Sequence, residues 1–196
     1  MESIVIDKNR TAVLIMDYQN DIVQRVPENK REELVERART VLSNARSSKL
    51  PVIYVVVRFR EGYPEVSPRN KRFATMKNSG QMQEGTSGAE IHPKLSPHPG
   101  DIVVTKRRVG AFSTTDLESI LRSKNIDTLV LLGIATSGVV LSTVRWAADM
   151  DYAMVVLGDV CADFDEEVHR VLTQKVFPRQ ATVLTTQEFL TTIKGH

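Results

Sequence analysis

The sequence predicts an α/β protein, a three-layer α/β/α sandwich around a six-stranded, mostly parallel, Rossmann-like sheet in the order 3-2-1-4-5-6. Short runs of β-branched and apolar residues recur along the chain, and each is nearly continuous, as in strands covered on both faces. Segments with helical spacing of apolar residues lie between these runs. The 196 residues suffice for a substantial core. We therefore expect a single domain over residues 1–196.

The expected elements alternate along the chain. The expected strands are 11–17, 51–57, 101–105, 127–133, 152–158 and 181–185. The expected helices are 28–48, 113–125, 138–149, 165–175 and 187–193. The helix over 113–125 begins with capping-type residues, so Ser113 or Thr114 is its expected N-cap. Such strand–helix alternation predicts right-handed crossovers between parallel strands.

The segment 59–100 departs from this pattern. It contains several glycines and prolines and has little periodicity. A connection of this length in a compact domain is typically a lid, a binding loop or an oligomer arm. These three interpretations stay open at the level of sequence.

Composition excludes several classes of function. The net charge of +2, with acidic and basic residues interspersed, gives no electrostatic case for nucleic acid. No apolar run approaches the ~20 residues of a transmembrane helix, and the acidic N-terminus does not resemble a signal peptide. A cytoplasmic protein without a membrane partner is expected. The single cysteine, Cys161, excludes an internal disulfide framework and a multi-cysteine zinc site.

The polar residues at the strand ends are the candidates for chemistry, because ligands of open α/β sheets bind at the carboxyl ends of strands. Asp17 follows five apolar residues, so burial should raise its pKa and a nearby lysine should lower it. Asp17 is also a suitable cap for the next helix. Lys106 precedes two arginines and is also compatible with solvated surface. The fourth strand runs into GIATSGVV (133–140), a tight turn without a cysteine.

Four segments carry a family resemblance. They are VLIMDYQND, VVTKRRVGAFSTTDLESILR, DTLVLLGIATSGVVLSTVRWAADMDY and VVLGDVCADFDEEVH. In this order and spacing the chain resembles the isochorismatase-like hydrolases, also called the cysteine hydrolase superfamily, across roughly residues 10 to 190. Members include isochorismatases, nicotinamidases and N-carbamoylsarcosine amidases.

The resemblance implies a triad of aspartate, lysine and cysteine. The aspartate falls on Asp17, the lysine on Lys106, and the cysteine position on Val139. A shift of one residue would place Gly138 there instead, and neither side chain is a nucleophile. Acyl-enzyme chemistry at Val139 is therefore excluded in this register. Cys161 is interpreted as a buried structural thiol, and Ser137 lacks a histidine nearby in sequence.

Three hypotheses follow. The first is a cysteine-independent hydrolase of an isochorismate-like vinyl ether or another small carboxylate, with Asp17 as general acid or base assisted by Lys106. The second is an amide hydrolase with another nucleophile or direct attack by water. The third is a degenerate member that binds without catalysis. The expected substrate-binding residues are Gln19, Arg58, Phe112, Thr136, Ser137 and Gly138, although Phe112 is an equally good core residue. Arg60, Arg107 and Arg108 are further candidates for binding a dicarboxylate.

The resemblance carries five more expectations. No cofactor is expected, and no catalytic metal, because VVVRFREGYPEV (55–66) lacks the histidines of the nicotinamidase site. A homodimer or homotetramer is expected. Tyr63, Phe73 and Met76 of the 59–100 segment would be exposed and available as contacts. A cis peptide is expected at Ala135–Thr136.

Overall fold

The computed structural model describes residues 6–194 and contains one six-stranded sheet. Its strands are β1 (Thr11–Met16), β2 (Val52–Val57), β3 (Ile102–Lys106), β4 (Thr128–Ile134), β5 (Ala153–Ala162) and β6 (Thr182–Leu184). Every neighbouring pair is parallel, and the order is β3-β2-β1-β4-β5-β6. The predicted fold class and strand order are confirmed. The strand β5 extends four residues beyond the expected end at 158.

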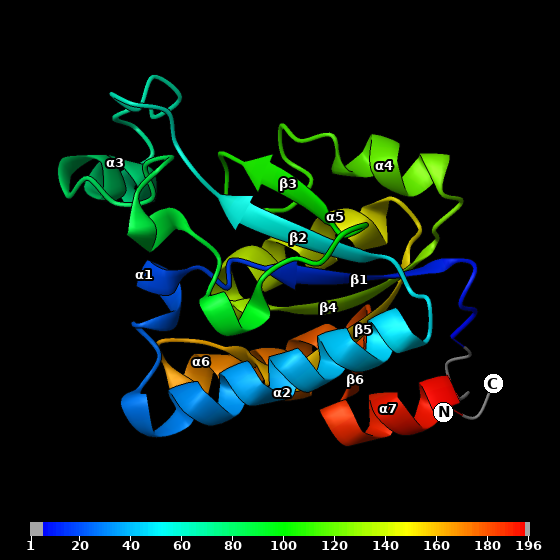
Figure 1. Cartoon of the computed structure of the whole chain (residues 1–196). Helices are drawn as coiled ribbons and strands as arrows, with labels where there is room; N and C mark the ends of the chain where they lie inside the picture. The colour runs from blue at the N-terminus through cyan, green and yellow to red at the C-terminus, as the bar shows by residue number, and fades with distance from the viewer. Residues whose placement is uncertain (1–5, 195–196) are drawn as a thin grey trace.

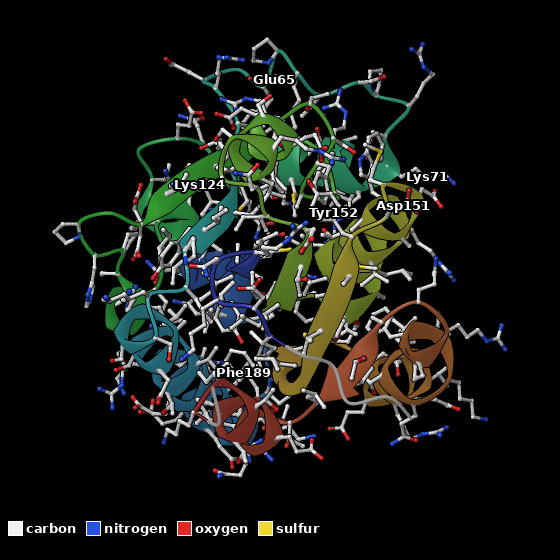
Figure 2. All side chains as sticks on the ribbon, turned by 90° about the vertical axis from the view of Figure 1, so that its right-hand side faces the viewer. Glu65, Lys71, Lys124, Asp151, Tyr152 and Phe189 are labelled. Atoms are coloured by element: carbon white, nitrogen blue, oxygen red, sulfur yellow. The ribbon has the colours of Figure 1, made fainter. Side chains whose placement is uncertain are left out.

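Helices cover both faces of this sheet (Figure 1). One face carries α2 (Glu28–Ser47) and α7 (Thr186–Lys194), and the other carries α4 (Leu117–Ser123) and α5 (Leu141–Asp149). Figure 2 shows Phe189 of α7 and Tyr152, which follows α5, on opposite sides of the sheet. Each belongs to a different apolar core. The predicted sandwich results because β1, β2 and β4 are buried along their whole length.

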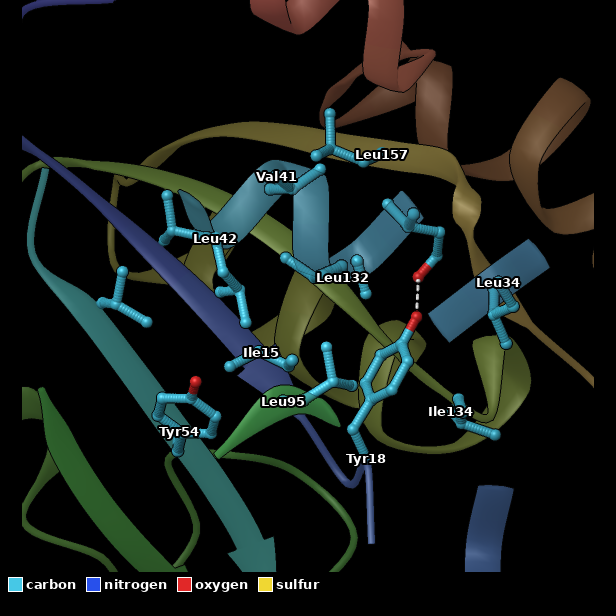
Figure 3. Packing of buried hydrophobic residues seen from close by; sticks show 14 of the residues in the cluster. Ile15, Tyr18, Leu34, Val41, Leu42, Tyr54, Leu95, Leu132, Ile134 and Leu157 are labelled. Carbon is cyan, nitrogen blue, oxygen red and sulfur yellow. Dashed lines mark hydrogen bonds between the residues drawn. The ribbon is translucent and has the colours of Figure 1, made fainter. Parts of the chain in front are cut away.

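The core beneath α2 reaches the carboxyl end of β1. Tyr18, just beyond β1, is 2% exposed and donates its hydroxyl hydrogen to Val160 O at 2.7 Å. Figure 3 shows this ring among Ile15, Leu34 and Ile134. A buried phenol needs such a partner, because an unpaired hydroxyl in an apolar region is costly. The bond ties the end of β1 to β5, across β4.

The shorter helical segments lie near the strand ends. They are α1 (Asn20–Val23), α6 (Glu166–Val171), the π turns Thr136–Val140 and Leu172–Val176, and the 3-10 turns Ser87–Ala89, Pro93–Leu95 and Phe177–Arg179. The expected caps Ser113 and Thr114 are wrong, since α4 begins at Leu117 with Asp116 as N-cap. Thr114 has φ 63°, a left-handed conformation that does not continue into a right-handed helix.

The segment 59–100 is folded onto the domain and contains a helix, α3 (Lys71–Asn78). The expectation that Tyr63, Phe73 and Met76 are exposed contacts is wrong. They are 5%, 2% and 6% exposed and belong to the core beneath α2. Tyr63 and Phe73 both contact the ring of Phe59, with ring centroids 5.6 and 5.1 Å away. In Figure 1 α3 lies beyond the arrowheads of β1 and β2. The segment therefore lies at the carboxyl end of the strands, where the sequence predicts the functional site.

Candidate active site

Asp17 and Lys106 form a buried ion pair at the carboxyl end of the sheet. Lys106 Nζ lies 2.9 Å from Asp17 Oδ2, and the side chains are 2% and 8% exposed. Lys106 Nζ also donates to Arg108 O at 3.1 Å. The second carboxylate oxygen of Asp17, Oδ1, is buried and has no hydrogen-bond partner among the described residues. One oxygen of the Asp17 carboxyl group therefore binds Lys106, and the other can still accept or donate a hydrogen bond.

The backbone at Asp17 explains how the carboxyl group reaches this position. Asp17 follows the last residue of β1 and has φ 59°, a left-handed conformation that aspartate tolerates better than most residues. Its N–H donates to Val55 O at 2.8 Å. The cap of α1 is Gln19, so Asp17 does not cap the following helix. Strained backbone of this kind is common at functional sites.

Burial controls the electrostatics of the pair. It raises the pKa of the Asp17 carboxyl, against the positive charges of Lys106 and Arg72, which lower it. Burial also lowers the pKa of the Lys106 ammonium, against Asp17, which raises it, and Arg72 lowers it further. Arg72 lies on α3 and is not among the residues that the sequence predicts for the site. The signal was present, because Asn70 is a capping residue and Phe73 and Met76 have helical spacing.

The turn after β4 carries the expected nucleophile position. Val139 is 2% exposed and belongs to the same apolar core as Met16, the residue before Asp17. A valine side chain there offers packing and no lone pair. The expected cis peptide is one residue out of place, since the cis bond joins Ile134 and Ala135. Gly138 is buried, and a Cβ there would meet only ordinary contacts with Ala135 and Val109.

Two side chains from the region after β5 hold this turn. Thr136 Oγ1 lies 2.8 Å from His169 Nδ1, and Thr136 is fully buried. The backbone N–H of Ser137 donates to Asp163 Oδ2 at 2.6 Å, while the Ser137 residue is exposed. His169 is 33 residues from Thr136 along the chain, so no local pattern predicts a histidine beside the turn. Only the tertiary fold makes this contact.

Gln19 and Arg58 hold the 59–100 segment. The Gln19 amide donates to Val57 O and Ala89 O at 2.8 and 2.7 Å and accepts from Val57 N at 2.8 Å. Arg58 donates to Ala89 O at 3.1 Å and pairs with Glu90 at 2.9 Å. In this arrangement both side chains bind protein groups, so they position the segment above the Asp17 site.

The remaining candidates contact other groups of the protein. Phe112 is 6% exposed and stacks on Trp146, with ring centroids 6.5 Å apart. Arg60 and Arg107 both pair with Glu65, at 2.5 and 2.7 Å, and Arg108 donates to Glu65 O at 3.2 Å. Glu65 and Lys71 mark this part of the 59–100 segment in Figure 2.

Four surface cavities of about 390 to 570 Å³ are lined by residues other than Asp17 and Lys106. Within residues 6–194, no three His, Cys, Asp or Glu side chains are grouped so as to hold a metal ion. No helix in the same range is long and apolar enough to cross a membrane.

The protein-family model of the isochorismatase domain matches residues 11–188 of this chain. An isochorismatase family protein of Bacillus subtilis (strain 168), YwoC, is 35% identical over 99% of this chain and 100% of its own length. A probable isochorismatase of Pseudomonas chlororaphis is 31% identical over 93% of this chain and 86% of its own. The crystal structure of N-carbamoylsarcosine amidase from Thermoplasma acidophilum is similar, with a TM-score of 0.73 and 28% identity over 90% of this chain and 96% of that one.

Proposed function

The chain belongs to the isochorismatase family, and on this premise we propose that it is a cysteine-independent hydrolase of a small carboxylate-bearing vinyl ether. Asp17 is the general acid in this proposal, and Lys106 orients it. The observation that carries the proposal is the Asp17 carboxyl group itself. One oxygen is fixed by Lys106, and the other is buried without a partner among the described residues.

This arrangement suits protonation of carbon. Because burial raises the pKa of Asp17, the group can carry a proton on Oδ1 at higher pH than an exposed aspartate. Transfer of that proton to the methylene carbon of an enol ether gives an oxocarbenium ion and leaves Asp17 ionised beside Lys106. Water then adds to the cationic carbon and returns a proton to Asp17. The resulting hemiketal collapses to a keto acid and an alcohol.

The valine at position 139 is compatible with this route. No step forms a bond between substrate and enzyme, so the missing thiol is not required. Val139 is packed in the core and can serve as an apolar wall. A covalent route would need a side chain with a lone pair at this position.

The positive charge of Arg72 supports recognition of a carboxylate. Arg72 is an exposed residue of α3, and its charge acts on both Asp17 and Lys106. A guanidinium is suited to bidentate binding of carboxylate. Asp17 and Lys106 are only 6% and 2% exposed, so substrate entry requires that the segment around α3 moves outward. Lids of this kind are common in hydrolytic sites.

The test is release of pyruvate from isochorismate. Asp17→Asn should lower the rate by about 10²–10⁴-fold, the usual contribution of general acid catalysis. Arg72→Gln should raise KM, while Arg69→Gln, at another exposed arginine before α3, should leave KM unchanged. Thermal melting would show that each variant is folded. An inactive wild-type protein, or a folded Asp17→Asn variant with full activity, would overturn the proposal.

A second candidate is binding without catalysis. It is favoured by the burial of the Asp17–Lys106 pair, which lines none of the four cavities described above. It predicts saturable binding of small carboxylates with no turnover in a metabolite screen.

Amide hydrolysis is a third candidate, favoured by the similarity to N-carbamoylsarcosine amidase. Ammonia release from a panel of amides would support it. Loss of that release in Ser137→Ala would identify serine as the nucleophile, and persistence would indicate attack by water.

A further inference from the structure

A separate cavity of about 570 Å³ lies between α2 and α6, beside the carboxyl-terminal part of β5. Lys30, Leu34 and Arg37 face it from α2 with helical spacing, and neither Asp17 nor Lys106 lines it. Its apolar lining consists of Val26, Pro27, Leu34, Cys161 and Ala162. This volume lies within the range of small-molecule sites, ~300–1,000 Å³.

The acidic side chains of the cavity already have partners. Two basic residues, Arg37 and Lys30, neutralise three of them, and backbone N–H groups hold the fourth. Arg37 lies 2.5 Å from Glu33 and 3.5 Å from Asp159, and Lys30 lies 2.5 Å from Glu166. Asp163 accepts hydrogen bonds from the N–H groups of Ser137 and Phe164, at 2.6 and 2.8 Å. A cationic ligand would have to displace these bonds.

Among the polar groups of the lining, Arg170 and His169 have the capacity to bind a ligand, because Arg170 has only a weak partner and His169 has one ring nitrogen left over. The guanidinium of Arg170 lies 3.7 Å from Glu167, and both side chains are largely exposed, at 48% and 80%. Such a surface pair is weak. The Nδ1 of His169 is bonded to Thr136, at 2.8 Å, which leaves Nε2 for a ligand. When Thr136 donates to Nδ1, Nε2 carries the ring hydrogen.

We propose that this cavity is a second binding site, which takes a small monocarboxylate with an aromatic or branched apolar body. The carboxylate binds the guanidinium of Arg170 and accepts a hydrogen bond from His169 Nε2. The apolar body lies against Leu34, Ala162 and the neighbouring apolar residues of the lining. This inference is independent of the chemistry at Asp17.

The site is linked to the turn after β4. His169 and Asp163 both line the cavity, and they bond to the consecutive residues Thr136 and Ser137. A ligand that binds His169 is thus linked, through that one side chain, to the turn that contains Val139. Binding should therefore order the His169–Thr136 contact.

Cys161 provides a built-in reporter, because it is the only cysteine in the sequence and it lines the cavity. The probe is benzoate, and the readout is the rate at which methyl methanethiosulfonate labels Cys161 at a fixed, mildly alkaline pH. Saturable protection by benzoate is expected, with weaker protection by neutral benzamide. Arg170→Gln should weaken the apparent affinity for benzoate by at least about tenfold, since it removes a charge-assisted hydrogen bond.

Two controls separate this site from the Asp17 site. Arg179→Gln, an exposed arginine outside the lining, should leave protection unchanged. Asp17→Asn should also retain it, so failure of the proposed vinyl-ether activity and failure of this site are distinguishable. The proposal is overturned if benzoate gives no protection, if protection survives in Arg170→Gln, or if it disappears in Asp17→Asn.

Discussion

Lys106 Nζ lies 2.9 Å from Asp17 Oδ2, although the two residues come from strands that are not neighbours. Asp17 follows β1 and Lys106 ends β3, with β2 between them. The long lysine side chain spans the intervening strand end. Both groups are almost completely removed from water, so each depends on the other for charge compensation.

Loss of one partner should be costly. Lys106→Met leaves the Asp17 carboxyl buried without its cation and should lower the free energy of unfolding by about 3 kcal/mol, as for other broken buried pairs. The double variant Asp17→Asn/Lys106→Met should recover part of this loss. Urea unfolding at neutral pH measures both. A single variant as stable as the wild type would show that the pair contributes nothing to the fold.

Removal of the Gln19 amide should loosen the 59–100 segment. Gln19→Met deletes three buried hydrogen bonds, to Val57 N, Val57 O and Ala89 O. We expect a loss of about 3 kcal/mol, since each buried group left unpaired costs ~1–3 kcal/mol. Faster proteolysis within 59–100 should accompany it. Gln187→Met, at an exposed glutamine, is the control, and an equal effect there would contradict the assignment.

Stability should fall in mild acid because of His169. Burial lowers the pKa of this imidazole from 6.5, and the charge of Lys30 also lowers it, against Asp163 and Glu166, which raise it. The unfolded chain then binds more protons than the folded one between the folded pKa and 6.5, so unfolding free energy decreases as pH falls through that window. His169→Gln should flatten this slope relative to wild type. His98→Gln, at an exposed histidine, is the comparison, and a slope unchanged in His169→Gln would refute the prediction.

A thiol at position 139 should be more reactive than a thiol elsewhere in the core. The family resemblance implies that position 139 faces Asp17 and Lys106, and an ammonium beside a thiol favours the thiolate. In a Cys161→Ala background, Val139→Cys should therefore react with iodoacetamide faster than Val140→Cys. The wild-type Cys161 sets a slow reference, since burial raises its pKa to about 12. Equal labelling of the two engineered thiols would argue that position 139 does not face the Asp17–Lys106 pair.

Much of the site was accessible from local sequence. Asp17 and Lys106 are candidates because each follows or ends an apolar run, and the edge where parallel strands end is the usual ligand edge. The family resemblance, and not the local sequence, implies that the two act together. The contacts of the 59–100 segment could not be predicted from the sequence, because they are made by single residues without a repeating pattern. Tyr63, Phe73 and Met76 were expected on the surface and are buried, since the Phe59 ring and the end of the sheet accept them. Nothing in the sequence near Arg58 indicates that its partners are Ala89 and Glu90.

The sequence by itself determined the parallel sheet, its order and the family, because these depend on periodicity and on residue identity at motif positions. The resemblance to that family also implied Val139 as the position of the missing nucleophile. The tertiary structure decided which groups meet. It paired Thr136 with His169, brought the charge of Arg72 close enough to lower the pKa values of Asp17 and Lys106, and formed the cavity between α2 and α6. Such contacts depend on how distant segments pack, and burial then sets the charge state of the groups that they bring together.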